Sequence, residues 1–341
     1  MRLHVHCACV LACRRYHQAN LASSMNLLDA LGRHGIRKIV FSSSAMVYDC
    51  SPSGGKPPFK ESAPQAGSSG GTVNPYARGK QFVEEILGDM AASPDGKGWG
   101  IISLRYFYAG GAHPTGRLGE DPTIAAASNE LRNVVAAVLG KKDCYMVCGS
   151  NYDTPDGTCV RDYVHVMDLA DAHLAAVQKL ATVASANLVY NLGSGAGVSD
   201  LEVVAAMEAT TGLKVTVKMA KRRPGDVAAA FVDPAKANKD LGWTAKRGID
   251  VMCKDLWRWS NANPSGYVKQ ETTFGAFKQA SFQTSSMPKF SSSYREGRSG
   301  RVSRASSDVQ GGGGGGGGGG LGGLKRMDTM EEMEFAMGQN F

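Results

Sequence analysis

The chain has 341 residues, of which 43% are hydrophobic, so it can bury a substantial core. Its formal net charge of +7 is modest, and no Lys/Arg-rich face interleaved with aromatic residues is found, which argues against nucleic-acid binding. No apolar run reaches about 18 residues, so we expect no membrane span. The eight cysteines form no disulfide-scaffold pattern, which is typical of reduced thiols in a cytoplasmic protein.

The N-terminal segment, residues 1–15, carries several potential zinc ligands. They are His4, His6, Cys7, Cys9 and Cys13. Structural zinc sites usually space their ligands roughly two to four residues apart and draw them from two chain segments. No second cluster is found, so we predict no metal site.

The next segments predict alternating strands and helices. Residues 36–44 form a short apolar run that ends in three serines, as expected of a buried parallel strand. Asn74-Pro75 predicts the start of a helix, whose apolar residues between 82 and 87 lie on one side. Residues 100–107 predict the following strand. This order is typical of a doubly wound α/β sheet, which binds ligands at the carboxyl ends of its strands.

The helix that follows Asn74 carries Tyr76 and Lys80, which lie on one face because they are four residues apart. A phenol normally loses its proton near pH 10, and a nearby cation favours the phenolate, so the pair can form a general base. Ser44, at the end of the preceding strand, can hold the same substrate oxygen. Such spacing also arises by chance on surface helices, and only the strand and loop before it favour the catalytic interpretation.

A glycine-rich segment at 193–197 follows a predicted strand at 188–192. We interpret it as structural, since Ser199 and Glu202 predict a capping box for a helix at 201–211. Gly212 then ends that helix.

Several sequence blocks occur together in one order. They are Phe41-Ser-Ser-Ser-Ala45, Asn74-Pro-Tyr-Ala-Arg-Gly-Lys80, Leu104-Arg-Tyr-Phe107, Gly111-Ala-His113, Gly116-Arg-Leu-Gly-Glu-Asp-Pro122, Asn151-Tyr-Asp-Thr-Pro-Asp-Gly-Thr158, Val160-Arg-Asp-Tyr-Val-His165, Asn191-Leu-Gly193, Arg222-Arg-Pro-Gly-Asp226 and Leu241-Gly-Trp243. With them the chain closely resembles the UDP-glucose 4-epimerase family of extended short-chain dehydrogenases/reductases. The resemblance runs from Tyr16 to Tyr267.

The resemblance implies an α/β fold: an incomplete Rossmann-type doubly wound parallel sheet, with a smaller C-terminal substrate-binding α/β domain. It places a partial NAD-binding domain at 16–110, with later strands returning from about 160–195. The region that binds the UDP-sugar falls mainly at 111–267. We expect residues 268–341, which include ten consecutive glycines, to be a disordered tail.

The family reaction interconverts UDP-glucose and UDP-galactose, in galactose metabolism, through a 4-keto intermediate with bound NAD. By resemblance, Tyr76 takes the proton of the sugar 4-hydroxyl, and Ser44 hydrogen-bonds the reacting oxygen. Lys80 holds the nicotinamide ribose and lowers the pKa of the phenol. Ala45 and Met46 follow Ser44, so the carboxylate that a dehydratase needs there is absent from the sequence, which favours epimerisation.

The resemblance also assigns residues to the two ligands. For NAD they are Asn20, Ser42, Tyr76, Lys80 and Tyr106. For the UDP-hexose they are Ser44, Tyr76, Phe107, Tyr108, Asn129, Arg161, Arg223, Asp226 and Ala230. Guanidinium forks suit a diphosphate and a carboxylate suits ribose hydroxyls, although each charged residue taken singly is equally typical of a surface ion pair.

The chain also departs from the family pattern. No G-x-x-G-x-x-G turn, which would bind the NAD pyrophosphate, precedes the strand predicted at 36–44, so we expect the N-terminal NAD-binding half-fold to be missing. Tyr108 replaces an asparagine that contacts substrate in the family. Glu130 and Arg132 replace the apolar and proline neighbours of Asn129.

Two alternatives therefore stay open beside the epimerase. One is an inactive or truncated homologue that acts as a binding partner through the helices near 20–34 and 76–90, which would also form a homodimer. The other is a 4-epimerase for N-acetylated or uronate sugars, since the small Ala230 leaves room for an N-acetyl group.

Overall fold

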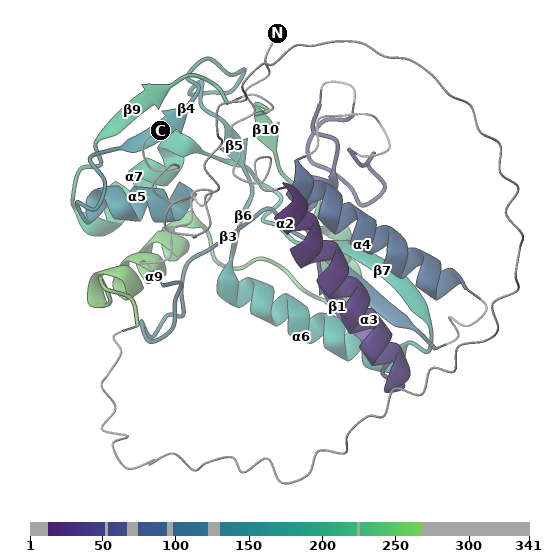
Figure 1. The fold of residues 1–341 in the computed structure, drawn as a ribbon. Helices are drawn as coiled ribbons and strands as arrows, with labels where there is room; N and C mark the ends of the chain where they lie inside the picture. The colour runs from purple at the N-terminus through teal and green to yellow at the C-terminus, as the bar shows by residue number, and fades with distance from the viewer. Residues whose placement is uncertain are drawn as a thin grey trace, which may run out of the picture. The chain divides into compact units, whose positions relative to one another are not determined.

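Helices and strands alternate along the part of the chain that this computed structural model describes, residues 13–51, 54–66, 74–93, 98–121, 130–223 and 226–267 (Figure 1). The helical elements are α2 (Cys13–His17), the π-helical η1 (Gln18–Ala22), α3 (Ser23–Arg33), the 3-10 turn η2 (Ala45–Val47), α4 (Pro75–Ala92), α5 (Glu130–Val138), α6 (Val166–Thr182), α7 (Asp200–Thr211), α8 (Ala235–Leu241) and α9 (Ile249–Ala262). The strands are β1 (Lys38–Ser42), β2 (Gly100–Arg105), β3 (Tyr108–Gly110), β4 (Tyr145–Cys148), β5 (Val160–Arg161), β6 (Tyr163–His165), β7 (Ala186–Asn191), β8 (Val198–Ser199), β9 (Val217–Ala220) and β10 (Ala229–Ala230).

The sheet β1-β2-β7 is parallel throughout. Ile39 pairs with Ile101 of the middle strand, and Ile101 pairs in turn with Asn187. All six residues of β2 are buried, because helices cover both faces of the sheet. The predicted α/β class with a doubly wound parallel sheet is therefore confirmed.

Successive residues of β2 point to opposite faces of the sheet, as in any strand. Ile101 packs with Val83 of α4 and Leu28 of α3. Ile102, one residue further, packs with Leu169 of α6 on the other face. The two helix layers thus meet the same strand, which is the doubly wound arrangement.

Helix α4 begins where the sequence predicts. The Asn74 side chain accepts a hydrogen bond from the backbone N–H of Ala77 at 2.8 Å, and Pro75 occupies the first helical position. Beside α4 lies a continuous helical rod made of α2, η1 and α3 (Figure 1). A Cβ at Gly79 would lie 3.4 Å from Cβ of Asn20, so this glycine permits the close approach of rod and helix.

The glycine-rich segment at 193–197 is a structural turn. The backbone N–H of Ser194 donates to Asp162 Oδ1 at 2.9 Å, and a Cβ at Gly193 would lie 2.2 Å from the other oxygen of Asp162. The predicted capping box at Ser199 then opens α7, and Gly212 ends it with a φ of 69°.

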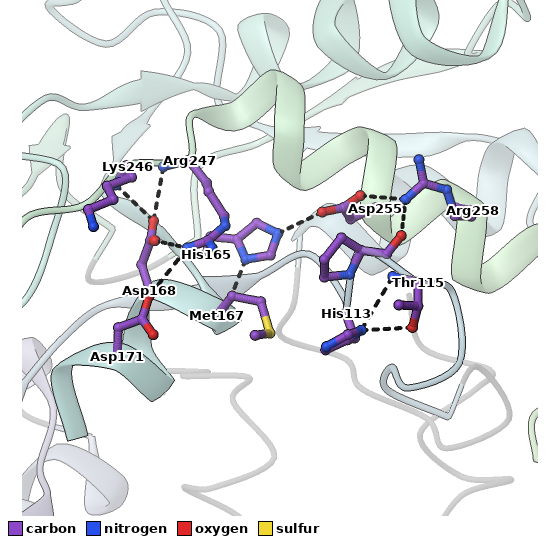
Figure 2. Close-up of polar contacts among 11 residues, drawn as sticks. His113, Thr115, His165, Met167, Asp168, Asp171, Lys246, Arg247, Asp255 and Arg258 are labelled. Atoms are coloured by element: carbon purple, nitrogen blue, oxygen red, sulfur yellow. Dashed lines mark hydrogen bonds and ion pairs between the residues drawn. The ribbon is translucent and has the colours of Figure 1, made fainter. Parts of the chain in front are cut away.

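The parallel pair β4 and β9 packs with α5, α7 and α9 around a second apolar core. Close to it, buried polar groups connect α6 with α9 (Figure 2). His165 is fully buried, caps α6 by accepting the N–H of Met167 at 3.0 Å, and places Nε2 3.4 Å from Asp255. Burial lowers the pKa of this imidazole. Asp168 of α6 pairs with Arg247, so these groups serve the fold.

Three observations bear on membranes, metals and thiols. Among the described helices, none is both long and apolar enough to cross a bilayer. In the same residues no group of three or more His, Cys, Asp or Glu is placed to hold a metal ion. The possible zinc ligands near the N-terminus lie outside the described side chains. The described cysteines are free thiols: Cys50, Cys144, Cys148, Cys159 and Cys253.

Candidate active site

The three serines at the end of β1 have three different partners. Ser42 Oγ lies 2.9 Å from His173 Nε2, and the buried Ser43 donates to Glu84. Ser44 begins η2, where its Oγ accepts the backbone N–H two residues ahead at 3.2 Å. The loop is thereby held rigid, because each hydroxyl is tied to a different part of the protein.

Ser44 and Tyr76 are brought together although 76 lies on α4 and 44 follows β1. Their side chains lie close enough for the Ser44 hydroxyl to lower the pKa of the Tyr76 phenol. Nζ of Lys80 donates to the carbonyl of Ser42 at 2.7 Å and lies 5.8 Å from the centre of the Tyr76 ring. The predicted serine, tyrosine and lysine therefore converge at the carboxyl end of β1.

The pKa of Tyr76 is shifted in the direction opposite to the one expected from the sequence. Burial of the half-buried phenol raises this pKa, and the hydrogen bond from Ser44 acts in the opposite direction. Burial also lowers the pKa of Lys80. Desolvation is the largest effect on both groups, because it disfavours the charged form of each.

The other residues assigned to NAD lie close to this group. Asn20 donates to the carbonyl of Tyr16 at 3.0 Å, one helix turn earlier, and contacts α4 at Gly79. The carbonyl of Tyr106 accepts the N–H of Ala45 at 2.9 Å. The phenols of Tyr106 and Tyr16 are near enough to act on the pKa of Tyr76.

Four residues assigned to the substrate form a second group, which we call the arginine cluster: Tyr108, Arg161, Arg223 and Asp226. Arg161 is buried, and its Nη1 donates to two backbone carbonyls at 2.9 Å each. Arg223 pairs with Asp226 at 2.7 Å. Burial raises the pKa of the Tyr108 phenol, and both arginines oppose that shift, so all four lie within electrostatic reach of one another.

Phe107 and Ala230 lie between the two groups. Both pack in the apolar cluster that contains Ala45, next to Ser44. Ala230 also pairs with Arg161 across β10 and β5. This cluster therefore connects the serine loop to the arginine cluster, whereas the remaining predicted residue, Asn129, lies outside the described residues.

One residue beside the arginine cluster was not predicted as a site residue. Glu130 is 8% exposed, and its Oε1 lies 3.8 Å from Nη2 of Arg223. The one signal available was an acidic residue at a position where apolar neighbours were expected.

The buried ion pair of Arg105 and Glu84 supports the loop that follows β1. Nε of Arg105 donates to Glu84 at 3.0 and 3.1 Å, and Glu84 also accepts from Ser43. Nη1 of Arg105 donates to the hydroxyl of Tyr48 at 3.1 Å, which donates to Asn191 at 2.6 Å. The network joins β2, α4 and β7 and leaves the Glu84 carboxylate engaged.

The donors at the end of β1 fit the ribose of a nicotinamide nucleotide. An ammonium has three donors, and Lys80 directs one of them to Ser42. Tyr76 and Ser44, whose hydroxyls lie close to one another, stand beside it at the carboxyl end of a doubly wound parallel sheet. The fold and the site together define an α/β enzyme that uses a dinucleotide cofactor.

Comparison with known proteins identifies the family. The family model described as "NAD dependent epimerase/dehydratase family" matches residues 8–193. Human UDP-glucose 4-epimerase is 43% identical over 258 residues, which are 75% of this chain and 70% of that protein. The UDP-glucose 4-epimerase of Bacillus subtilis (strain 168) is 43% identical over 257 residues, which are 75% and 72% of the two chains. The chain belongs to the NAD dependent epimerase/dehydratase family.

Solved structures agree with this assignment. The UDP-glucose 4-epimerase of Bifidobacterium longum, in complex with NAD+ and UDP, matches with a TM-score of 0.68 and 42% identity. The match covers 76% of this chain and 73% of that one. The enzyme from Stenotrophomonas maltophila, solved with NAD and a formylated UDP-arabinopyranose, matches with the same TM-score at 36% identity.

Proposed function

We propose that this chain is a UDP-hexose 4-epimerase that interconverts UDP-glucose and UDP-galactose with bound NAD, a reaction of galactose metabolism. The observation that carries the proposal is that Ser44, Tyr76 and the anchored Lys80 come together at the carboxyl end of β1. The 43% identity to UDP-glucose 4-epimerases supports the same reaction.

Tyr76 is the acid–base group in this proposal. Its phenolate accepts the proton of the sugar 4-hydroxyl and later returns it, while Ser44 holds the same oxygen. Lys80, held by the Ser42 carbonyl, hydrogen-bonds the nicotinamide ribose. Bound NAD supplies the hydride chemistry at C4 of the sugar.

The arginine cluster is the proposed site of the nucleotide part. Arg161 and Arg223 offer planar donor forks for the two phosphates, and Asp226 offers oxygens for ribose hydroxyls. Epimerisation is favoured over dehydration, because Ala45 and Met46 follow Ser44 and the nearby Glu84 is engaged by Arg105.

The test begins with cofactor retention. The purified full chain is denatured, and released NAD is quantified by mass spectrometry; UDP-galactose conversion is then followed. Tyr76→Phe should fold and retain NAD but lose roughly 10²–10⁴-fold in kcat. A folded, monodisperse chain without NAD and without conversion would overturn the epimerase.

We further propose a homodimer through α3 and α4. Met25 and Leu27 on α3 are 49% and 53% exposed, and Phe82 on α4 is 38% exposed, so these helices present apolar surface to solvent. A chain that fails to retain NAD would keep this surface and act as a partner for an intact relative. Light scattering of Leu27→Glu beside the unsubstituted chain tests the dimer, which the charge should dissociate. We propose the cytoplasm as the compartment.

A further inference from the structure

Glu130, the first residue of α5, is a buried carboxyl to which the proposed reaction assigns no role. It is 8% exposed, and its Oε2 has no hydrogen-bond partner among the described residues. Its Oε1 lies 3.8 Å from Nη2 of Arg223, too far for a hydrogen bond. A buried carboxylate oxygen without a partner is costly while it is charged. The position therefore favours a protonated carboxyl.

The charges around Glu130 oppose one another. Burial is the largest effect and raises the pKa of this carboxyl. A hydrogen bond from the residue's own backbone, Arg223 and Arg161 lower it, Asp200 of α7 raises it, and the net pKa is about 7. Asp226 faces the same arginines and pairs with Arg223. Glu130 in turn raises the pKa of four groups that face it: Tyr108 of β3, Tyr145 and Cys148 of β4 and Tyr163 of β6. Burial raises the pKa of each of these four groups, so they stay neutral near pH 7.

We propose that Glu130 is a proton-linked specificity residue: a nucleoside diphosphate held by Arg161 and Arg223 binds when the carboxyl of Glu130 is protonated. The inference rests on the proposed function, in which these two arginines hold the diphosphate of a nucleotide sugar.

The physical reason is competition for one cation. A charged Glu130 and a diphosphate held by Arg223 compete for the same guanidinium, from which Glu130 lies 3.8 Å away, and two anions beside one cation repel one another. Protonation removes the competing charge and turns the carboxyl into an O–H donor that a phosphate oxygen can accept. Binding then takes up from solvent the proton that Glu130 lacks in the free protein, which approaches one proton at a pH well above the free pKa, and no other bond changes.

Linkage gives the sign of the pH dependence. The bound anion raises the pKa of Glu130 further, so affinity is highest at low pH. It falls as pH rises through the pKa of the free protein, by at most about tenfold per pH unit. A cluster of arginines without a titrating carboxyl would show no such loss, because guanidinium groups do not titrate in this range.

The test is calorimetric titration with UDP-glucose, whose diphosphate does not titrate near neutrality. It uses the full chain carrying Tyr76→Phe, so that no turnover contributes heat. We expect affinity to fall by up to roughly tenfold from pH 6 to pH 8. Heats measured near pH 7.5 in buffers of different ionisation enthalpy should reveal proton uptake.

Adding Glu130→Gln should abolish both effects and strengthen binding at pH 8. Glu85→Gln, which removes an exposed carboxyl of α4, should change neither.

Two results would overturn the inference in distinguishable ways. Equal pH dependence with and without Glu130→Gln would exclude the proton link and leave nucleotide-sugar binding in place. Absence of binding by either chain at any pH would overturn the proposed function, and the inference with it. If Glu130→Gln does not fold, the contradicting result is that the chain with Glu130 in place binds UDP-glucose without taking up a proton.

Discussion

Lys80 on α4 donates a 2.7 Å hydrogen bond from Nζ to the backbone carbonyl of Ser42, 38 residues earlier in the chain. The same ammonium lies 5.0 Å from the centre of the Phe41 ring. This contact fixes the lysine head between α4 and the end of β1. The distance from the cation to the Tyr76 phenol is thus set by the sheet as well as by the helix.

Replacement of Lys80 should weaken cofactor retention more than stability. Lys80→Met keeps the aliphatic stem but removes a charge-assisted donor, whose loss costs about 1.5–3 kcal/mol, or roughly tenfold to a hundredfold in NAD affinity. Arg78→Met removes an exposed cation of the same helix and is the control. Released NAD and the melting temperature are measured for both. Equal NAD content in the two variants would contradict a role for Lys80.

Removal of the Ser44 hydroxyl should shift the pH dependence of the reaction. The hydrogen bond from Ser44 lowers the pKa of Tyr76, so in Ser44→Ala this pKa rises and less phenolate is present at any given pH. The rising limb of kcat should therefore move to higher pH, in addition to any loss of rate. The measurement is a pH–rate profile with UDP-galactose, with Ser93→Ala at the end of α4 as control. A uniform fall in rate without a shift would argue against the assignment.

Breaking the buried ion pair between Arg105 and Glu84 should unfold part of the population. Their side chains are 3% and 7% exposed, so Glu84→Gln leaves an uncompensated guanidinium at a cost of roughly 3–5 kcal/mol. The exposed pair of Arg33 and Asp29 is the comparison, since both side chains are 71% exposed and Arg33→Gln should cost less than about 1 kcal/mol. Urea unfolding monitored by circular dichroism gives both values, and similar costs would refute the distinction.

Gly111 should resist substitution for two separable reasons. Its φ is 84°, and a Cβ there would lie 2.5 Å from Nε2 of the buried His165. Gly140 has a φ of 68° with no atom within 4 Å of its Cβ position, so Gly140→Ala carries only the conformational cost of about 1–2 kcal/mol. Gly111→Ala should add roughly 1–3 kcal/mol of overpacking. Thermal unfolding of both variants tests this. Equal melting temperatures would contradict the prediction, because they would show that His165 moves away from the added methyl group at little cost in free energy.

The local predictions came closest where a side chain acts on its own segment. The start of α4 depends on Asn74, and the two ends of α7 depend on Ser199 and Gly212. Each of these residues acts on groups only a few positions away in the chain, so all three helix ends were predictable. Strand limits were less exact. The strand predicted at 36–44 is β1 at Lys38–Ser42, because pairing with β2 decides which residues join the ladder. The direction of the Tyr76 pKa shift was missed because burial depends on what packs against the ring.

The sequence by itself determined the spacing of Tyr76 and Lys80 and the family to which the chain belongs, since helix periodicity and ordered blocks of residues need no coordinates. Tertiary structure decided the rest of the site. It brings Ser44 beside Tyr76 and gathers Arg161, Arg223 and Glu130 from distant segments. Burial then sets the protonation of Glu130, because the cost of a charge depends on the atoms around it and not on its neighbours in the chain.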